Sequence, residues 1–338
     1  MRRFFDPRSL AHAPIRELHN GAFIPHADTP LRAESVAAAV GPCEPPRDFG
    51  EAPILAVHDA GYVEFLKSAY DRWVAAGREG DAIGYTYPVV HRRPLALQRI
   101  DAQLGQYSFD ASTPITPHTW AASYWSTQCA LSAVAAVLEG DKAAFALVRP
   151  PGHHAGADYL GGYCYLNAAA IAAQAARDAG VPRVAVLDID YHHGNGTQDI
   201  FWTRGDVLYV SIHADPVTDY PFYWGHADET GEAEGEGATL NLPLPRGTGI
   251  EAFRAAQARA LEAVAAFGAG LLVVSFGADT YAGDPISQFT LETADYASLA
   301  ADIAALGLPT AVVMEGGYAD EALGRNVVSF LGGFGSDA

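Results

Sequence analysis

The segment from Asp188 to Gly196 combines two carboxylates, two imidazoles and two glycines directly after a short apolar run. Asp188 and Asp190 are two residues apart, and in a strand alternate side chains point to the same side of the backbone. His192 follows at the same spacing. A carboxylate and an imidazole presented together suit a borderline cation such as Zn²⁺. The same residue types are also common in a polar turn, so this segment alone leaves metal binding open.

Polar side chains also follow three other apolar runs, one of which ends in serine. These side chains are a pair of histidines, an aspartate and a tyrosine: His153, His154, Asp279 and Tyr318. In a parallel α/β sheet, ligands bind beyond the carboxyl ends of the strands. If the runs are such strands, the histidines, carboxylates and tyrosine meet in one crevice. Convergence of these side chains from four strand ends favours a catalytic metal site over a polar turn without a function.

The runs that precede these residues are short, apolar and rich in β-branched side chains, which predicts buried strands. With one further run of the same kind, they are residues 143–148, 184–187, 207–210, 271–275 and 311–314. Alanine-rich segments of helical length lie between them, such as 167–178, 250–267 and 293–306. This alternation predicts an α/β fold, with a single open, mostly parallel multi-stranded sheet and helices on both faces. No proline- or serine-rich linker divides the chain, so we expect residues 1–338 to form one domain.

Two segments depart from this alternation. Residues 81–118 are rich in aromatic residues, proline and arginine, and we predict a long ordered loop there. Residues 215–237 form a second predicted loop, aromatic at first and then acidic. Long loops in compact domains are usually functional or lie at interfaces.

The overall composition is that of a globular enzyme. The formal net charge is −19, which repels nucleic acid and attracts cationic solutes, although an acidic surface also confers solubility by itself. Cys43, Cys129 and Cys164 form no CxxC pair, which favours a reducing cytoplasm over a disulfide framework. The N-terminus lacks the apolar stretch of a signal peptide, and no run is long enough for a membrane span. We therefore expect a cytoplasmic protein with neither nucleic-acid nor membrane partners.

Three motifs resemble those of the arginase/histone deacetylase superfamily: Arg149-Pro-Pro-Gly-His-His, Asp188-Ile-Asp-Tyr-His-His-Gly-Asn-Gly-Thr-Gln and Glu315-Gly-Gly-Tyr. The similarity runs in order over nearly the whole chain, from about residue 12 to about residue 332. Within the deacetylase branch, the chain is most similar to the bacterial acetylpolyamine amidohydrolases. Support for that placement comes from the insert at about 81–118, Gly161-Gly-Tyr-Cys-Tyr-Leu-Asn167 and Asp284-Pro-Ile-Ser287.

The resemblance implies one catalytic Zn²⁺, with Asp190, His192 and Asp279 as protein ligands and an open position for water and substrate. An arginase-like site with two metals would need a further aspartate two residues after Asp279, where this chain has Tyr281. One metal per chain is therefore the better prediction. Fe²⁺ or Co²⁺ would fit the same ligands, so the native metal stays open.

The resemblance also implies the catalytic roles. His154 would act as the general base towards water and later protonate the leaving amine, with His153 beside it. Tyr318 would donate its hydroxyl to the developing oxyanion. Asp188 and Asn195 would orient the two histidines. The position of Asn195 is often Asp in the family, and Asn should make His154 less basic.

The family further binds a monovalent cation, K⁺ or Na⁺, beside the catalytic metal. The resemblance implies that its ligands come from five residues: Asp188, Asp190, His192, Ser211 and Ile212. By residue type alone, Asp188 would equally serve as a buried hydrogen-bond partner.

The implied substrate is an acetylated amine whose acyl group fits a narrow pocket. Tyr163 and Tyr220 match the aromatic walls of the deacetylase tunnel, and Gly162 would offer its backbone carbonyl to the substrate. Aromatic faces accept a methylene chain and attract a cationic amine. Asp101, in the insert, would add an acidic rim that prefers a polyamine.

Other residues of the insert weaken the case for a polycation. The chain has Ser112 where the family has another acidic residue, although Asp110 is available to replace it. Arg92, Arg93 and Arg99 would oppose binding of a polycation. Acetyl-lysine side chains and other small acetamides therefore stay open as substrates.

The sequence thus predicts a zinc-dependent amidohydrolase that removes acetyl groups from acetylated polyamines or related small amines. The alternatives are a deacetylase of acetyl-lysine side chains and a hydrolase of other small amides. A non-catalytic sensor is disfavoured because the metal ligands, the histidine pair and the tyrosine are all present. In the branch with this insert, the loop commonly builds a dimer that narrows the tunnel mouth. We therefore expect a homodimer rather than a monomer with a surface-packed loop.

Overall fold

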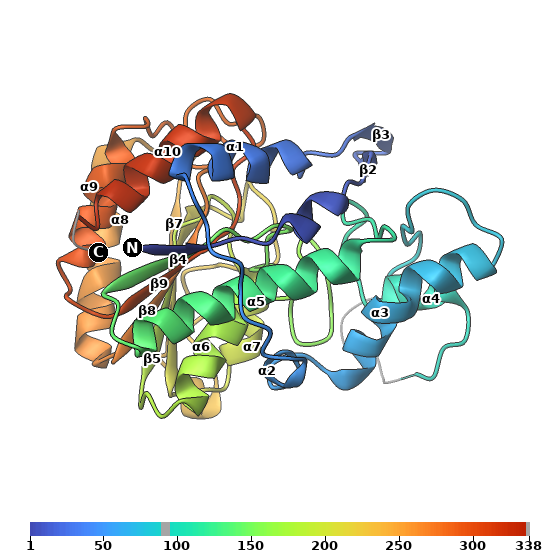
Figure 1. Cartoon of the computed structure of the whole chain (residues 1–338), viewed down its shortest axis with the longest axis horizontal. Coiled ribbons are helices and arrows are strands. Elements are labelled where there is room, and N and C mark those ends of the chain that lie inside the picture. The colour runs from blue at the N-terminus through green and yellow to red at the C-terminus, as the bar shows by residue number, and fades with distance from the viewer. Residues whose placement is uncertain (89–94, 336–338) are drawn as a thin grey trace.

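A seven-stranded parallel sheet forms the centre of the computed structural model, which describes residues 1–88 and 95–335 (Figure 1). All six pairs of neighbouring strands are parallel. In their order across the sheet, the strands are β1 (Arg2–Phe4), β4 (Ala143–Ala146), β9 (Thr310–Met314), β8 (Leu271–Phe276), β5 (Val184–Asp188), β6 (Val207–Ala214) and β7 (Thr239–Leu244).

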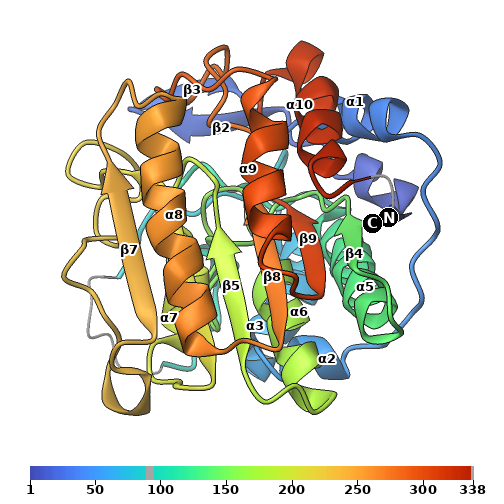
Figure 2. The ribbon, with the colours of Figure 1, turned by 90° about the vertical axis from the view of Figure 1, so that its left-hand side faces the viewer.

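Helices cover both faces of this sheet (Figure 2). Helices α5, α6 and α7 pack on one face, and α8, α9 and α10 lie on the other, with α1 beside α10. The described helices are α1 (Pro30–Val40), α2 (Ala52–Leu55), α3 (Ala60–Ala75), α4 (Ile100–Gln106), α5 (Thr119–Leu138), α6 (Ala168–Asp178), α7 (Asn195–Phe201), α8 (Ile250–Phe267), α9 (Asp295–Ala304), α10 (Asp320–Gly332) and the 3₁₀ turns Pro7–Ala11 and Ala233–Gly235.

The predicted α/β fold is confirmed. Its central strands are buried because helices cover both faces of the sheet. Every residue of β5, β6, β8 and β9 is buried, which is why these strands are continuous apolar runs rather than alternating ones. All five predicted strands are present, as are the three predicted helices, with ends that shift by a few residues. That residues 1–338 form one domain stays a prediction.

Strands β1 and β7 and helix α5 are among the elements that were not predicted. Strand β1 has only three residues, and β7 carries a proline within its run. Helix α5 buries 14 of its 20 residues. A helix enclosed on nearly all sides shows no polar stripe, and the periodicity that identifies surface helices is lost.

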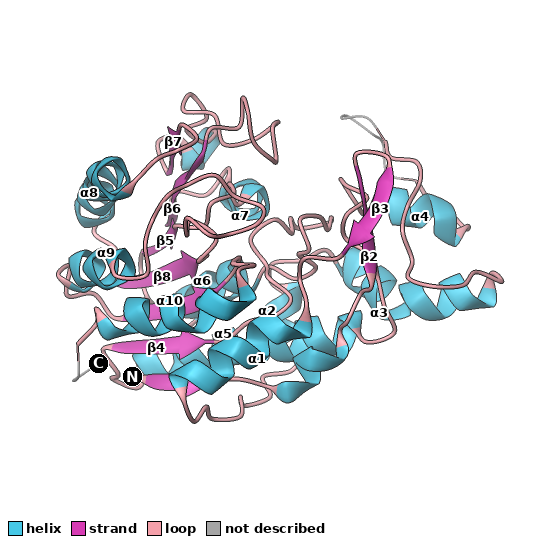
Figure 3. Ribbon diagram, turned by 90° about the horizontal axis from the view of Figure 1, so that it is seen from above, coloured by secondary structure: helices cyan, strands magenta, loops and turns pink. Residues whose placement is uncertain are grey.

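The insert at 81–118 is not simply a long loop, because it contains helix α4. Residues 89–94, including Arg92 and Arg93, lie outside the described part of the chain. Helices α3 and α4 lie at the same end of the molecule as the antiparallel hairpin of β2 (Arg16–His19) and β3 (Ala22–Pro25) (Figure 3). The carboxyl ends of the sheet strands face this end. Among the described helices, none is long and apolar enough to cross a membrane.

Candidate active site and metal centre

The strands that lead into the predicted site residues are neighbours in the sheet. Their order is β4, β9, β8 and β5, so four loops leave the carboxyl edge side by side. The loops carry His153 and His154 after β4, Tyr318 after β9, Asp279 after β8 and Asp190 after β5. Topology therefore brings together residues that lie up to 165 positions apart in the sequence, from His153 to Tyr318.

The three predicted metal ligands form one compact group. Potential ligand atoms of Asp190, His192 and Asp279 all lie within 4.8 Å of one another. His192 Nδ1 is 3.1 Å from Asp279 Oδ2 and 3.4 Å from Asp190 Oδ1. Two carboxylates and one imidazole in this arrangement fit a tetrahedral Zn²⁺ site that keeps a fourth position for water or substrate.

Backbone amides fix the orientation of both carboxylates. The Tyr191 amide donates to Asp279 Oδ1 at 2.9 Å, and the Gly316 amide donates to Asp190 Oδ2 at 2.8 Å. A Cβ atom at Gly316 would lie 2.5 Å from the same Asp190 oxygen, so only glycine lets the backbone approach this closely. Both carboxylates are thus positioned by main chain rather than by flexible side chains.

The charges of this group also favour a cation. Burial raises the pKa of Asp279, and the neighbouring Asp190 carboxylate raises it further, to about 7. Burial would lower the pKa of His192, but its contacts with Asp190 and Asp279 outweigh burial and raise it to about 10. A proton on His192 therefore partly neutralises the negative charge of the two carboxylates, as a bound divalent ion would. The residues present fit the metal that the sequence predicts.

The paired histidines have different partners. His153 Nδ1 donates to Asp188 Oδ2 at 3.0 Å, and His154 Nδ1 donates to Asn195 Oδ1 at 2.7 Å. Their ring centroids are 4.1 Å apart. One histidine thus faces a charged carboxylate and the other a neutral amide, as predicted for the orienting residues.

These partners separate the protonation of the two rings. Burial would lower the pKa of His153, but the carboxylates of Asp188 and Asp190 outweigh it and raise the pKa to about 10. Burial lowers the pKa of His154 well below its usual value, and the nearby His153 and His192 cations lower it further. His154 is therefore the neutral imidazole of the pair, which is the state that a general base requires.

Tyr318 lies on the loop after β9, and contacts on two sides hold it. Its backbone amide donates to Asp284 Oδ2 at 2.6 Å, and the Arg32 guanidinium lies 4.5 Å from its ring centroid. Arg32 also donates to the backbone oxygens of Gly317 and Glu315. Burial raises the pKa of the Tyr318 phenol well above its usual value, so the hydroxyl stays protonated and able to donate.

The predicted tunnel residues lie beside this group. The Tyr220 ring lies 5.1 Å from the His154 ring, and the Tyr163 ring lies 5.7 Å from the Tyr318 ring. Asp110 Oδ2 accepts hydrogen bonds from the Gly162 amide at 2.7 Å and from the Tyr220 hydroxyl at 2.9 Å. Asp110 therefore links the backbone of Gly162 to the side chain of Tyr220.

Asp101, the predicted acidic rim residue, is not brought to this group. It lies in α4, where its carboxylate accepts from Arg78 at 2.9 Å and from Arg99 at 2.6 Å. Arg99, which was expected to oppose binding of a polycation, is thus paired with Asp101. A substrate contact of Asp101 stays a prediction.

Three of the predicted monovalent-cation residues lie on adjacent strands, and Asp190 and His192 follow the first of these strands. Asp188 of β5 is the register partner of Ser211 of β6, and Ile212 follows Ser211. The Ser211 hydroxyl lies 2.7 Å from His213 Nδ1, while Asp188 Oδ2 accepts from the Tyr209 hydroxyl at 3.2 Å. Whether a cation binds there also stays a prediction.

Sequence reasoning missed two carboxylates that support the site. Glu315 is fully buried, and its Oε2 accepts the backbone amides of Gly152 at 2.6 Å and His153 at 3.1 Å. Glu315 also lies close enough to His153 and Cys164 for the three to resemble a metal site. Its Oε1 accepts from the Ser275 hydroxyl, however, so both carboxylate oxygens are already hydrogen-bonded. Its position directly after β9 was the available signal.

The second missed carboxylate is Glu17, in β2. Its Oε1 accepts from the Tyr163 hydroxyl at 3.1 Å, and its Oε2 has no hydrogen-bond partner among the described residues. Burial raises the pKa of Glu17 to about 7. Nothing in the local sequence connects Glu17 with Tyr163, since their contact depends on how the hairpin folds back.

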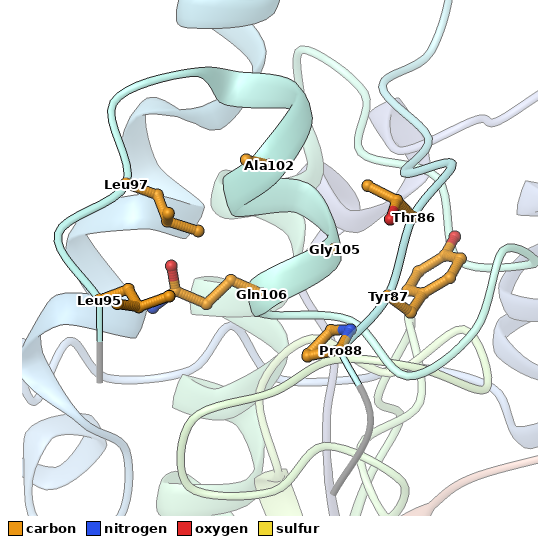
Figure 4. Close-up of a pocket in the computed structure, with 8 residues that line it drawn as sticks. All are labelled: Thr86, Tyr87, Pro88, Leu95, Leu97, Ala102, Gly105 and Gln106. Carbon is orange, nitrogen blue, oxygen red and sulfur yellow. The ribbon is translucent and has the colours of Figure 1, made fainter. Parts of the chain in front are cut away.

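The insert contains a separate cavity of about 230 Å³ (Figure 4). None of its lining residues belongs to the group described above, and most of the surface is apolar. The cavity lies between α4 and the segment before the undescribed residues, and its lining is Thr86, Tyr87, Pro88, Leu95, Leu97, Ala102, Gly105 and Gln106.

Known proteins are similar to this chain in sequence and in architecture. A model of the histone deacetylase domain matches residues 26–334. Acetylpolyamine amidohydrolase 1 of Pseudomonas aeruginosa is 50% identical over 333 residues, which cover 96% of this chain and 95% of that protein. The acetylpolyamine amidohydrolase of Mycoplana ramosa is 46% identical over 335 residues, which cover 98% of each chain. The crystal structure of acetylpolyamine aminohydrolase from Burkholderia pseudomallei aligns with a TM-score of 0.95 and 46% identity over 99% of each chain. This chain belongs to the histone deacetylase domain family.

Proposed function

We propose that this protein is a zinc-dependent amidohydrolase that removes the acetyl group from acetylated polyamines and related small amines. One observation carries the proposal: a three-ligand metal group lies beside a neutral histidine and a protonated tyrosine, all at one sheet edge. The names of the relatives in Pseudomonas aeruginosa and Mycoplana ramosa point to the same substrate class.

The chemistry follows from where protons are held. A bound Zn²⁺ would supply Lewis acidity, making water a better nucleophile and the amide carbonyl a better electrophile. His154 donates from Nδ1 to Asn195, which leaves the lone pair on Nε2 free to accept a proton from the attacking water. The same nitrogen then returns that proton to the leaving amine.

Charge that develops on the carbonyl oxygen needs a donor. The Tyr318 hydroxyl supplies one in this proposal, since burial keeps it protonated. His153 adds a fixed positive charge at the site, because Asp188 holds its proton. His153 therefore stabilises negative charge without exchanging a proton during turnover.

The walls of the approach favour a slender cationic amine. Tyr163 and Tyr220 present aromatic rings that accept a methylene chain, and their faces attract an ammonium group. Asp110 adds a carboxylate between these walls, and the formal charge of −19 raises the local concentration of cations.

Three further properties belong to the proposal. A K⁺ or Na⁺ ion binds at Asp188, Asp190, His192, Ser211 and Ile212. Two copies of the chain associate through the insert and narrow the approach. The protein works in the cytoplasm, in keeping with its three free cysteines. Light scattering after size-exclusion chromatography, giving only the monomer mass, would refute the dimer.

The experiment that tests the substrate compares kcat/KM for acetylputrescine, acetylcadaverine, acetylspermidine and an acetyl-lysine peptide, using zinc-loaded protein. We expect the acetylated diamines and acetylspermidine to be preferred, and removal of the metal by a chelator to abolish turnover until Zn²⁺ is restored. A wide preference for the peptide would overturn the polyamine assignment. Protein that hydrolyses none of the four after zinc loading would refute the enzymatic proposal altogether.

A further inference from the structure

The side-chain amide of Asn195 decides what His154 can do. Its Oδ1 accepts from His154 Nδ1 at 2.7 Å. If the amide were turned over, Nδ2 would face His154 Nδ1 instead, and that nitrogen would have to accept. The imidazole hydrogen would then sit on Nε2, where a general base needs its lone pair. Something must therefore hold the amide in the productive orientation.

Tyr159 is the residue that can do so. Its hydroxyl donates to Asp199 Oδ2 at 2.6 Å, and Asn195 Nδ2 donates to the same hydroxyl oxygen at 3.3 Å. Burial raises the pKa of Asp199 to about 6, so at neutral pH its carboxylate is ionised and can only accept. The hydroxyl hydrogen is therefore committed to Asp199. The Tyr159 oxygen is consequently left as an acceptor, and the half of Asn195 that faces it must be the NH₂ group.

We propose that Tyr159, set by Asp199, is a positioning residue that locks the Asn195 amide and thereby the tautomer of His154. In the turned-over amide, Asn195 Oδ1 would face the Tyr159 oxygen with no hydrogen between them. His154 Nδ1, Asn195, Tyr159 and Asp199 thus form a chain of hydrogen bonds in which each donor direction dictates the next. The chain runs from the buried base to the carboxylate of Asp199 in α7.

This arrangement matters because residue 195 is an amide. A carboxylate there would offer His154 an oxygen whichever way it turned and would need no lock. The two ends of an asparagine differ in hydrogen bonding although they have the same shape, so packing alone does not distinguish them. Tyr159 itself is held by packing, with the Phe109 ring edge-on at 5.6 Å, so a phenylalanine would keep its place there.

The inference rests on the proposed role of His154, and Tyr159→Phe tests it in the zinc-loaded enzyme. We expect kcat for acetylputrescine to fall by roughly threefold to tenfold. Loss of one hydrogen bond shifts the equilibrium between the two orientations of the Asn195 amide by about this factor. KM, zinc content and melting temperature should not change. The matched control is Tyr124→Phe, which removes a tyrosine–aspartate hydrogen bond, to Asp48, away from the site. That control should leave kcat unchanged.

A second background separates the lock from a packing effect. In Asn195→Asp protein, adding Tyr159→Phe should not lower kcat, because the symmetrical carboxylate does not need to be oriented. An equal loss of kcat in both backgrounds would overturn the proposal, and so would an unchanged kcat in the Asn195 background. Unsubstituted, zinc-loaded enzyme without any amide hydrolysis would instead refute the proposed function, which keeps the two failures distinct.

Discussion

At the scale of single residues, the site is built by giving similar groups different surroundings. Asp190 and Asp279 are both buried, and His153 and His154 are adjacent in sequence, yet each member of a pair has different partners. The carboxylate beside His153 and the amide beside His154 separate the protonation of the two rings. Residue types in the motifs predicted which side chains form the site. The hydrogen-bond partners seen in the structure explain which protonation state each side chain adopts.

Tyr318→Phe isolates the donor role of the phenol. The variant should keep its zinc, because Asp190, His192 and Asp279 are untouched, while kcat falls about 10²-fold or more with the loss of a hydrogen bond to the developing oxyanion. Zinc content and steady-state kinetics on the same preparation measure both quantities. Turnover close to that of the unsubstituted enzyme would remove Tyr318 from the mechanism.

Glu17 should make stability depend on pH. Its pKa is raised by burial to about 7 from an ordinary 4.5, so between these values the unfolded chain has lost a proton that the folded protein keeps. Stability contributed by Glu17 therefore falls as pH rises through this window. Glu17→Gln, which can still accept from Tyr163, should raise the melting temperature at pH 8 and leave it nearly unchanged at pH 4.5. An equal shift at both values would mean that ionisation of Glu17 is not responsible.

At the scale of elements, the sequence predicted five of the seven strands of the sheet, because burial on both faces makes them unbroken apolar runs. It did not reveal α5, whose enclosed surface carries no polar stripe. The supporting roles of Glu17 and Tyr159 were out of reach, and the only signal for Glu315 was its position directly after β9. Each contacts a segment far away in the sequence, and only the folded loops bring the partners together. For Asp101 the sequence suggested a contact with substrate, but it did not reveal the ion pairs of this residue with Arg78 and Arg99.

One loop makes this dependence on close packing testable. Gly162 has a φ of +54°, and a Cβ atom there would lie 2.2 Å from Cδ2 of His154. We expect Gly162→Ala to reduce kcat/KM more than about tenfold, because a displaced base loses its alignment. Gly237 also has a positive φ, of +78°, with nothing within 4 Å of a Cβ atom, and Gly237→Ala is the control.

The control carries the backbone strain without the clash, so Gly237→Ala should lower the free energy of unfolding by about 1 kcal/mol and leave kcat/KM unchanged. Denaturant titration and steady-state kinetics measure the two effects. Similar kinetic losses in both variants would mean that strain, and not contact with His154, explains the result.

At the scale of the whole molecule, the dominant property is charge. There are 40 acidic and 21 basic residues, so the field around the protein is negative well beyond any single side chain. That field cannot choose between substrates of equal charge, but it favours cations over neutral amides. Selectivity for charge should therefore depend on salt, whereas selectivity for shape should not.

Ionic strength tests this division. Raising the salt from about 20 mM to about 500 mM shortens the Debye length from roughly 20 Å to about 4 Å and should lower kcat/KM for acetylputrescine several-fold. N-butylacetamide, which is neutral and similar in length, should change little and controls for effects of salt on the enzyme. Parallel declines for both substrates would show that long-range attraction does not contribute.

The order of the strands has a consequence for biosynthesis. Strand β9 is the last strand in the sequence, yet it lies between β4 and β8. Until residues 310–314 have left the ribosome, the sheet can exist only as two separate pieces, each with an open edge that invites pairing with other chains. Chains that terminate early should consequently be prone to aggregation and recognised by chaperones. The four loops can then form one site only after β9 has been inserted between β4 and β8.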